Sequence, residues 1–215
     1  MTKKSFCIAN WKMNKNIKET MKFLDKINNF DLSVSDSNII ICPSFINLHY
    51  ISKINKNSKI LFGCQNISEK YRGSYTGEIS ISMVESTKCS WVIIGHSERR
   101  KLYNDTNQII ADKMQIVYQS SLNPILCIGE TIKQKKNGDT QKVLEHQIVS
   151  AFSKIKFKEK KEIIIAYEPI WAIGAGIAAT VTIIKQNMQI IKNIINSFDT
   201  NNCNLYLLYG GSVDE

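Results

Sequence analysis

Short apolar runs without alternation recur along the chain, and a longer amphipathic segment follows most of them. Such a run between turn signals is typical of a strand buried on both faces. The repeat of about thirty residues is that of parallel strand–helix–strand units. The pattern predicts strands at Phe6–Asn10, Ile39–Cys42, Ile60–Gln65, Trp91–Gly95, Pro124–Cys127, Ile163–Tyr167 and Leu205–Tyr209.

Apolar residues at helical spacing predict helices between these strands. A capping box is predicted at the start of the first helix, because Glu19 follows Asn16 by three residues. Its expected apolar stripe consists of Met21, Phe23, Leu24 and Ile27. The predicted helices are Ile17–Ile27, Ile46–Asn55, Ile81–Thr87, Ile109–Ser120, Thr140–Ser153 and Thr182–Ser197.

One carboxylate, Glu168, stands at the end of the most apolar strand and directly before Pro169. Proline cannot donate a ladder hydrogen bond, so the strand should end there. The apolar segment that follows is broken by two glycines, as expected of a loop that moves over a site. A glutamate at a strand end often caps the next helix. That helix begins only near Thr182, so we favour a functional role for Glu168.

Parallel strands with intervening helices allow either an open doubly wound sheet or a barrel. No G-x-G-x-x-G motif follows the first strand, which argues against a dinucleotide fold. In a barrel, the carboxyl ends of all strands meet on one face. Polar residues gather at those ends, namely Asn10, Lys12, Gln65, Asn66, His96, Glu98, Glu130, Glu168 and Ser212. We therefore predict an α/β TIM barrel, with residues 1–215 forming a single domain.

Composition narrows the functional classes. With 215 residues, of which 43% are hydrophobic, the chain can form one sizeable core. No apolar run reaches the length of a membrane span, and we expect a soluble cytoplasmic protein without a membrane partner. The six cysteines contain no C-x-x-C pair and are expected to be buried thiols, without disulfides or a metal site.

The net charge of +9 raises the possibility of nucleic-acid binding. The lysines, however, are scattered over predicted helix faces and gathered in expected loops such as 133–136 and 154–161. Such runs are usually solvated surface. We expect no nucleic-acid partner, although a basic field would attract a small anionic substrate.

Six motifs, taken in order, resemble the triosephosphate isomerase family from Phe6 to Val213. They are ANWKMN (9–14), YTGEIS (75–80), GHSERR (95–100), CIGET (127–131), YEPIWAIG (167–174) and YGGSV (209–213). The resemblance implies interconversion of dihydroxyacetone phosphate and glyceraldehyde 3-phosphate in glycolysis and gluconeogenesis. It also implies a homodimer that needs neither cofactor nor metal.

The reaction implied by the resemblance moves a proton between adjacent carbons through an enediolate. Glu168 would be the base, since a carboxylate shielded from water has a raised pKa. His96 would be the electrophile; it precedes an apparent helix start at Ser97, and a helix amino terminus keeps the imidazole neutral. Lys12 and Asn10 would stabilise the developing oxyanion and the phosphate.

The resemblance assigns supporting roles to further residues. Backbone amides near Gly174, Gly211 and Ser212 would hold the phosphate, beneath a lid at Pro169–Ala179. Glu98 and Cys127 would organise the site. Tyr75 and Thr76 would form the tip of a long loop that inserts into the partner subunit.

The chain departs from the family pattern at several places. Asp105 replaces a glutamate that pairs with Arg99, which should weaken that pair by ~0.3–1 kcal/mol. The lid hinge at 174–179 and Val181 also differ, so we expect altered lid kinetics.

The sequence ends at Glu215, roughly 35 residues short of a typical barrel of this kind. We expect an eighth strand–helix unit to be missing, which would leave the first and seventh strands with open edges. It would also remove phosphate contacts in the eighth loop, at a cost of ~3–6 kcal/mol. A non-catalytic remnant that associates with a full-length subunit is the alternative, although Lys12, His96 and Glu168 are all present.

Overall fold

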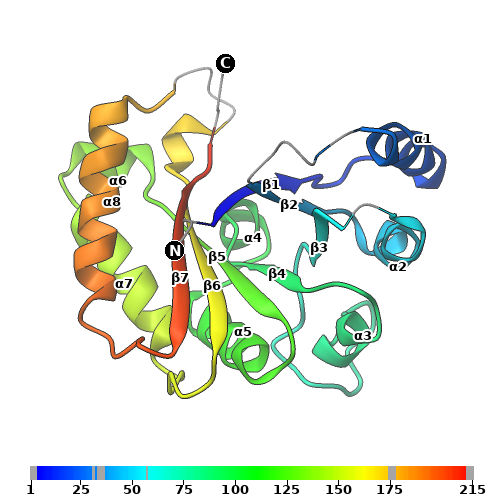
Figure 1. Cartoon of the computed structure of the whole chain (residues 1–215). Coiled ribbons are helices and arrows are strands. Elements are labelled where there is room, and N and C mark those ends of the chain that lie inside the picture. Colours follow the sequence, from blue (N-terminus) through cyan, green and yellow to red (C-terminus); the bar gives the residue numbers. More distant parts are fainter. Residues whose placement is uncertain (1–3, 31, 33–36, 57, 174–177, 212–215) are drawn as a thin grey trace. The chain divides into compact units, whose positions relative to one another are not determined.

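The structure is a computed structural model that describes residues 4–30, 32, 37–56, 58–173 and 178–211. Its internal contacts divide the chain into two compact units, each described here by itself (Figure 1). The first unit holds residues 1–93 and 120–122. The second holds residues 94–119 and 123–215.

The first unit is a parallel sheet whose strands follow one another in chain order. Cys7 pairs with Ile39, Ile40 with Leu61, and Gly63 with Trp91. Its elements are β1 (Ser5–Asn10), α1 (Ile17–Asn28), β2 (Ser37–Cys42), α2 (Phe45–Ile54), β3 (Ile60–Cys64), α3 (Ile81–Glu85) and β4 (Trp91–Ile94), whose last residue belongs to the second unit.

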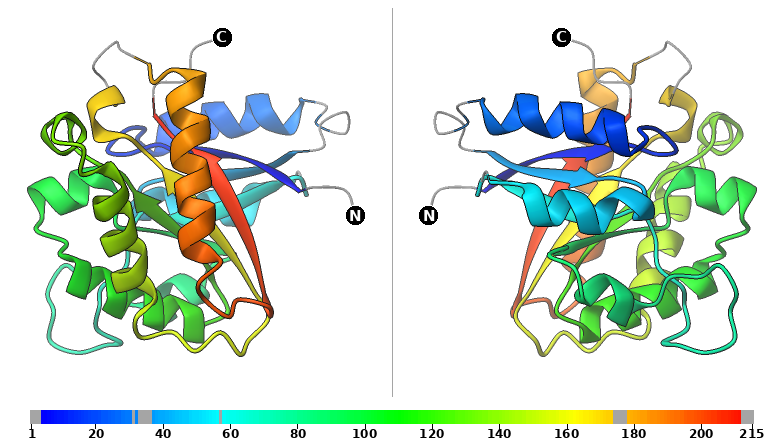
Figure 2. Two further views of the ribbon diagram at one scale, coloured as in Figure 1. Left: turned by 90° about the vertical axis from the view of Figure 1, so that its left-hand side faces the viewer. Right: turned by 90° about the vertical axis from the view of Figure 1, so that its right-hand side faces the viewer.

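The second unit continues the same alternation. Ile125 pairs with Ile164, and Ile164 pairs with Tyr206, both in parallel register. Helices α7 and α8 pack together, and α8 lies along β7 in both Figure 1 and the left view of Figure 2. The elements are α4 (Ser97–Leu102), α5 (Asn107–Gln119), β5 (Asn123–Ile128), α6 (Ile132–Lys136), α7 (Thr140–Phe152), β6 (Lys161–Tyr167), the 3₁₀ turn η1 (Ile170–Ala172), α8 (Val181–Ile195) and β7 (Cys203–Tyr209).

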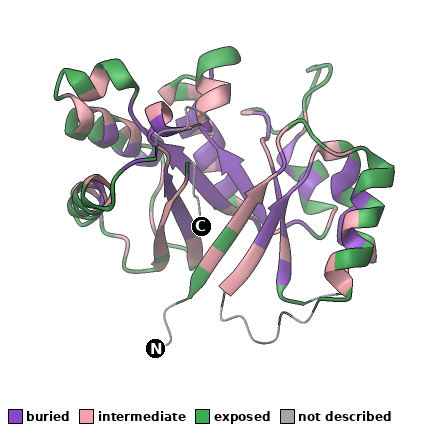
Figure 3. Ribbon diagram, turned by 90° about the horizontal axis from the view of Figure 1, so that it is seen from above, coloured by how far each residue is buried: buried purple, intermediate pink, exposed green. Residues whose placement is uncertain are grey.

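Burial differs sharply among the strands (Figure 3). All four residues of β4 are buried, as are the last five of β6. By contrast, neither β1 nor β7 contains a buried residue. Apolar runs at β4 and β6 therefore lie in the core, as the absence of alternation predicts.

The predicted strands and helices are confirmed, with bounds that differ by at most two residues. The capping box of α1 is also present: Asn16 Oδ1 accepts from the Glu19 amide at 3.0 Å, and Glu19 Oε2 accepts from the Asn16 amide at 2.8 Å. Satisfying both donors fixes the helix start.

Three details of the prediction are wrong. Residues 133–136 are not a loop but lie in helix α6, which begins with a second capping box formed by Thr131 and Gln134. Met21 is 42% exposed and so lies off the buried stripe of α1. All six cysteines are free thiols, but Cys7 is exposed and Cys203 only half-buried.

Candidate active site

His96 is separated from the end of β4 by Gly95 alone, and it caps the amino terminus of α4. Its ring is buried, with 9% of the side chain exposed. Nδ1 accepts a hydrogen bond from the Glu98 amide at 3.3 Å. Because Nδ1 is an acceptor here, the neutral ring carries its proton on Nε2.

Glu168 lies directly after β6, and its carboxylate faces His96. Glu168 Oε2 is 3.8 Å from His96 Nε2, and only 17% of the glutamate side chain is exposed. The Cys127 thiol donates to Glu168 Oε1 at 3.5 Å, and the Glu168 amide donates to the Ile128 carbonyl at 2.8 Å. The ends of β4, β5 and β6 therefore place an acid–base pair and a thiol together.

Two glycines leave the space that Glu168 occupies. A Cβ on Gly129 would lie 1.9 Å from the Glu168 carbonyl oxygen, and one on Gly210 would lie 2.8 Å from Glu168 Cγ. Both glycines belong to the recognised motifs, but their role in seating the glutamate follows only from the coordinates. Gln147 of α7, which no sequence signal distinguished, anchors Gly129 with bonds to its amide at 2.9 Å and its carbonyl at 3.1 Å.

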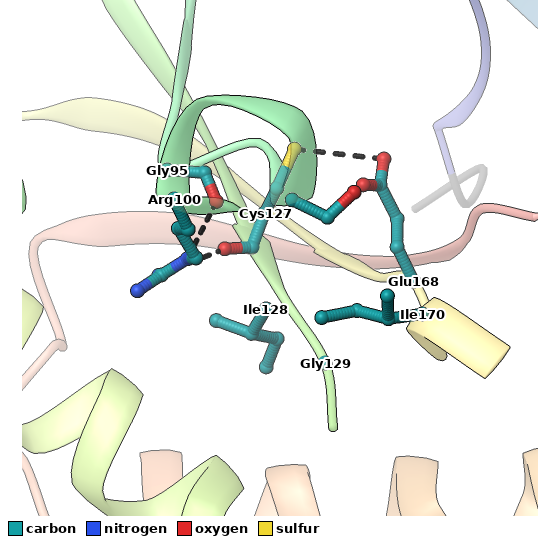
Figure 4. A pocket seen from close by; sticks show the side chains of 8 residues that line it. Gly95, Arg100, Cys127, Ile128, Gly129, Glu168 and Ile170 are labelled. Atoms are coloured by element: carbon teal, nitrogen blue, oxygen red, sulfur yellow. Dashed lines mark hydrogen bonds between the residues drawn. The ribbon is translucent and has the colours of Figure 1, made fainter. Parts of the chain in front are cut away.

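A small pocket of about 10 Å³, roughly the room of one water molecule, opens beside this carboxylate (Figure 4). Glu168 and the Cys127 thiol lie on one side of the close-up, with the Arg100 side chain beside the Gly95 and Cys127 backbones. The lining residues are Gly95, Ser97, Arg100, Cys127, Ile128, Gly129, Glu168 and Ile170. The pocket thus has a carboxylate, Glu168, and a half-buried guanidinium, Arg100, in its lining.

A buried network fixes the chain just beyond Glu168. Glu130 is fully buried and accepts from Trp171 Nε1 at 2.8 Å and from the Tyr167 hydroxyl at 3.2 Å. Asn187 donates to the Tyr167 oxygen at 2.6 Å. Burial, with the Glu130 charge beside it, raises the pKa of Tyr167 well above its usual value. Lys135 lies over the Trp171 ring, 3.3 Å from its centroid.

Asp105 retains its expected arginine and gains a second cation. It accepts from Arg99 Nε at 2.9 Å and from Lys113 Nζ at 2.8 Å. Both Asp105 and Lys113 are buried, with 5% and 2% of their side chains exposed. Burial alone would raise the pKa of Asp105, but the hydrogen bonds from Arg99 and Lys113 hold it below its usual value. Sequence reasoning missed Lys113.

Asn10 and Lys12 belong to the first unit. Asn10 ends β1, and its Oδ1 accepts from the Lys12 amide at 3.0 Å, which leaves the Asn10 amide group as a donor. Lys12 has a φ of 52°, in the left-handed region that non-glycine residues seldom adopt. Gln65 steadies this turn by donating to the carbonyls of Lys12 and Cys42, at 2.9 Å each.

The remaining predicted site residues are placed as follows. Tyr75 and Thr76 are exposed in the loop between β3 and α3. Glu98 lies in the first turn of α4, with Oε2 3.6 Å from His96 Nδ1. Gly211 is exposed just after β7, whereas Gly174 and Ser212 lie outside the described residues.

The described residues contain neither a metal-binding cluster nor a membrane-spanning helix. No group of three or more histidine, cysteine, aspartate or glutamate side chains in these ranges is arranged to hold a metal ion. No helix there is both long and apolar enough to cross a bilayer.

Comparison with known proteins decides the family. The family model described as "Triosephosphate isomerase" matches residues 5–215. The chain belongs to the triosephosphate isomerase family. Among curated relatives, the triosephosphate isomerase of Endomicrobium trichonymphae is 35% identical over 99% of this chain and 85% of its own length. Those of Aquifex aeolicus and Thermodesulfovibrio yellowstonii are both 38% identical, covering 96% and 98% of this chain and 83% and 85% of their own lengths.

Family membership confirms the predicted fold class, the TIM barrel, of which the described chain carries seven strands. It also agrees with the paired His96 and Glu168 at the ends of β4 and β6, because sites of this fold form at the carboxyl ends of the strands. In the sequence, the segments YEPIWAIG (167–174) and GHSERR (95–100) carry these two side chains.

Proposed function

We propose that the protein interconverts dihydroxyacetone phosphate and D-glyceraldehyde 3-phosphate, as an isomerase of glycolysis and gluconeogenesis. One observation carries the proposal within this family: a buried carboxylate, Glu168, lies 3.8 Å from the Nε2 of a buried imidazole, His96. A carboxylate and an imidazole facing each other can act on adjacent atoms of one small substrate.

Glu168 acts as the base. It takes a proton from the hydroxymethyl carbon of the ketose and returns that proton to the neighbouring carbon of the enediolate. The 17% exposure of its side chain supports this role, because a poorly hydrated carboxylate holds a proton more readily than one in water.

His96 acts as the electrophile in its neutral form. The Nε2–H gives its proton to the carbonyl oxygen of the ketose as charge develops there, and Nε2 recovers a proton from the neighbouring hydroxyl, so the proton lost from one oxygen is gained by the other. The hydrogen bond from the Glu98 amide to His96 Nδ1 supports this assignment, since it fixes the tautomer with the proton on Nε2.

Lys12 supplies the positive charge, and Asn10 a neighbouring hydrogen bond, for the oxyanion and the phosphate. Their place at the carboxyl end of β1 and the left-handed backbone of Lys12 support the assignment, because strained residues cluster at functional sites. The phosphate is held by amides near Gly174, Gly211 and Ser212, and residues 169–179 act as the lid. Glu98 and Cys127 keep His96 and Glu168 in place, as their contacts suggest.

The protein assembles as a homodimer in which Tyr75 and Thr76 enter the partner subunit. Exposed apolar side chains support this assembly: Met13 is 97% exposed, Ile46 71% and Tyr75 47%. Met13 and Ile46 shortly follow β1 and β2, which are adjacent parallel strands, so these two lie at the same end of the first unit. An Ile46→Asp variant should shift the dimer toward monomer in analytical ultracentrifugation; an unchanged dimer would argue against this surface.

We also place the two compact units in one TIM-barrel domain and the protein in the cytoplasm, where a glycolytic isomerase meets its substrates. It needs neither metal nor cofactor, and phosphorylated trioses are its small-molecule partners. A membrane or a nucleic acid has no part in this function.

An enzyme-coupled assay of the purified protein tests the proposal. Formation of dihydroxyacetone phosphate is followed by its NADH-dependent reduction, with Glu168→Asp measured alongside. The variant withdraws the carboxylate by about one methylene and should lower kcat by ~10²–10³-fold. If the folded wild-type protein turns over no faster than this variant, the proposal is wrong and the non-catalytic alternative gains support.

A further inference from the structure

Arg100 uses its whole guanidinium group to bridge two strand ends. Its Nε donates to the Gly95 carbonyl at 2.7 Å, and its Nη2 donates to the Cys127 carbonyl at 3.2 Å. A third bond, from Nη1 to Asn107 Oδ1 at 2.7 Å, holds the group from α5 (Figure 4 shows the first two). A planar fork of donors suits such multiple bonding, whereas an ammonium group does not.

Each bridged carbonyl is one step from a proposed catalytic side chain. Gly95 directly precedes His96 and has a φ of 72°. An ideal Cβ on Gly95 would lie 2.9 Å from Arg100 Nη2, so the arginine fills the space that this glycine leaves. Cys127, whose carbonyl takes the second bond, donates its thiol to Glu168 Oε1 at 3.5 Å.

Arg100 also brings a positive charge into the small pocket beside Glu168. Arg100 lines the same pocket as Glu168 and interacts with it electrostatically. Burial lowers the pKa of Arg100, yet a guanidinium remains protonated at neutral pH. Among the described residues of the second unit, the His96 ring and the Cys127 thiol also face Glu168, and Glu98 lies on the other side of the ring.

We propose that Arg100 is a positioning residue of the isomerase site. It sets the spacing between His96 and Glu168 by tying the end of β4 to the end of β5, and its charge favours the ionised base. The inference rests on the proposed function. A purely structural arginine would make the same bonds but would leave the pH profile of turnover unchanged in a folded variant.

Two substitutions of Arg100 distinguish the effect of its hydrogen bonds from the effect of its positive charge. Arg100→Gln removes both, so kcat should fall about 10–100-fold with KM changed less than about threefold, because misplacement of catalytic groups lowers kcat. Loss of a nearby cation raises the pKa of a carboxylate. The acidic limb of the kcat profile should therefore move to higher pH by about half a unit or more.

Arg100→Lys keeps the charge but cannot span both carbonyls. It should show the fall in kcat without the shift of the acidic limb. Lys142→Gln is the matched control, because it removes an exposed cation from α7 of the same unit and should change neither parameter. Thermal unfolding of each variant identifies any loss that comes from unfolded protein.

The outcomes distinguish this inference from the proposed function. If the wild type has no isomerase activity, the proposed function fails. If the wild type is active and both folded Arg100 variants match Lys142→Gln in kcat and in pH profile, the positioning role is wrong. Should Arg100→Gln not fold, the Arg100→Lys variant still decides, because an unchanged kcat there overturns the inference.

Discussion

Nε2 of His96 and Oε2 of Glu168 face each other across 3.8 Å in the second unit. This separation exceeds that of a normal hydrogen bond, so the imidazole does not form a close hydrogen bond with the carboxylate. The other ring nitrogen is held by the Glu98 amide, which fixes the ring. In the proposed mechanism, Glu168 thus lies beside a rigidly held donor and can turn toward a substrate carbon.

Replacing the ring tests the assigned donor. We expect His96→Gln to lower kcat by about 10²–10⁴-fold, because the amide of glutamine cannot place an N–H where Nε2 lies. Stability should change by less than about 1.5 kcal/mol, as measured by urea unfolding, since the cap of a short helix is the main bond lost. His49→Gln, at an exposed position on α2, is the control and should leave steady-state kinetics unchanged.

The space around the carboxylate can be tested separately. In Gly210→Ala the new methyl group would lie 2.8 Å from Glu168 Cγ and 3.1 Å from Oε1. The carboxylate must move, so kcat should fall roughly 10–100-fold. Gly138→Ala is the matched control: nothing lies within 4 Å of its added methyl group, and its φ of 77° should cost only about 1 kcal/mol of stability. Equal kcat in both variants would contradict the steric argument.

The sequence predicts the architecture well because its apolar runs leave little choice. Short unbroken runs such as Ile163–Tyr167, bounded by turn signals, are typical of strands buried on both faces in a parallel sheet. The prediction of a loop at 133–136 was wrong because these four polar residues show no apolar periodicity that would indicate a helix. The helix begins instead at a capping box that includes Gln134. Local capping overrides composition at that point.

Of the candidate site, the sequence predicts only the residues that stand in recognisable motifs. His96 and Glu168 follow from motifs at strand ends, and they do lie together. The contacts that hold them come from ordinary-looking residues, such as Gln147 on Gly129 and Lys113 on Asp105. A glutamine or lysine in an amphipathic helix has no sequence signature, because its role depends on which strand end the helix face meets.

The ion pairs of buried Asp105 with Arg99 and Lys113 should stabilise the wild type relative to Asp105→Asn, by an amount that depends on pH. Asp105→Asn leaves Lys113 as a buried charge, so the variant should be about 3–5 kcal/mol less stable at pH 7. The folded pKa of Asp105 lies below its unfolded value of about 3.9. This stabilisation is therefore present above pH ~4 and is lost as the pH falls through the folded pKa.

Urea unfolding at pH 7 and pH 3 measures both quantities. The difference between wild type and Asp105→Asn should narrow at the lower pH. Asp25→Asn, at an exposed position on α1, should show only a small difference at either pH. If the stability difference between wild type and Asp105→Asn were the same at pH 7 and pH 3, the ion pairs of Asp105 would not be its cause.

Tyr167 and Tyr209 offer a matched pair of hydroxyl deletions. The Tyr167 hydroxyl donates to Glu130 and accepts from Asn187, so Tyr167→Phe leaves two buried groups short of a partner. We expect a loss of ~2–4 kcal/mol in urea unfolding. The Tyr209 hydroxyl is buried and has no partner among the described residues, so Tyr209→Phe should be neutral or slightly stabilising.

In the double variant Tyr167→Phe with Asn187→Leu, part of the lost stability should be recovered, since the amide left without a partner is removed as well. Equal stability of the two single variants would show that the Glu130 network contributes nothing to the fold.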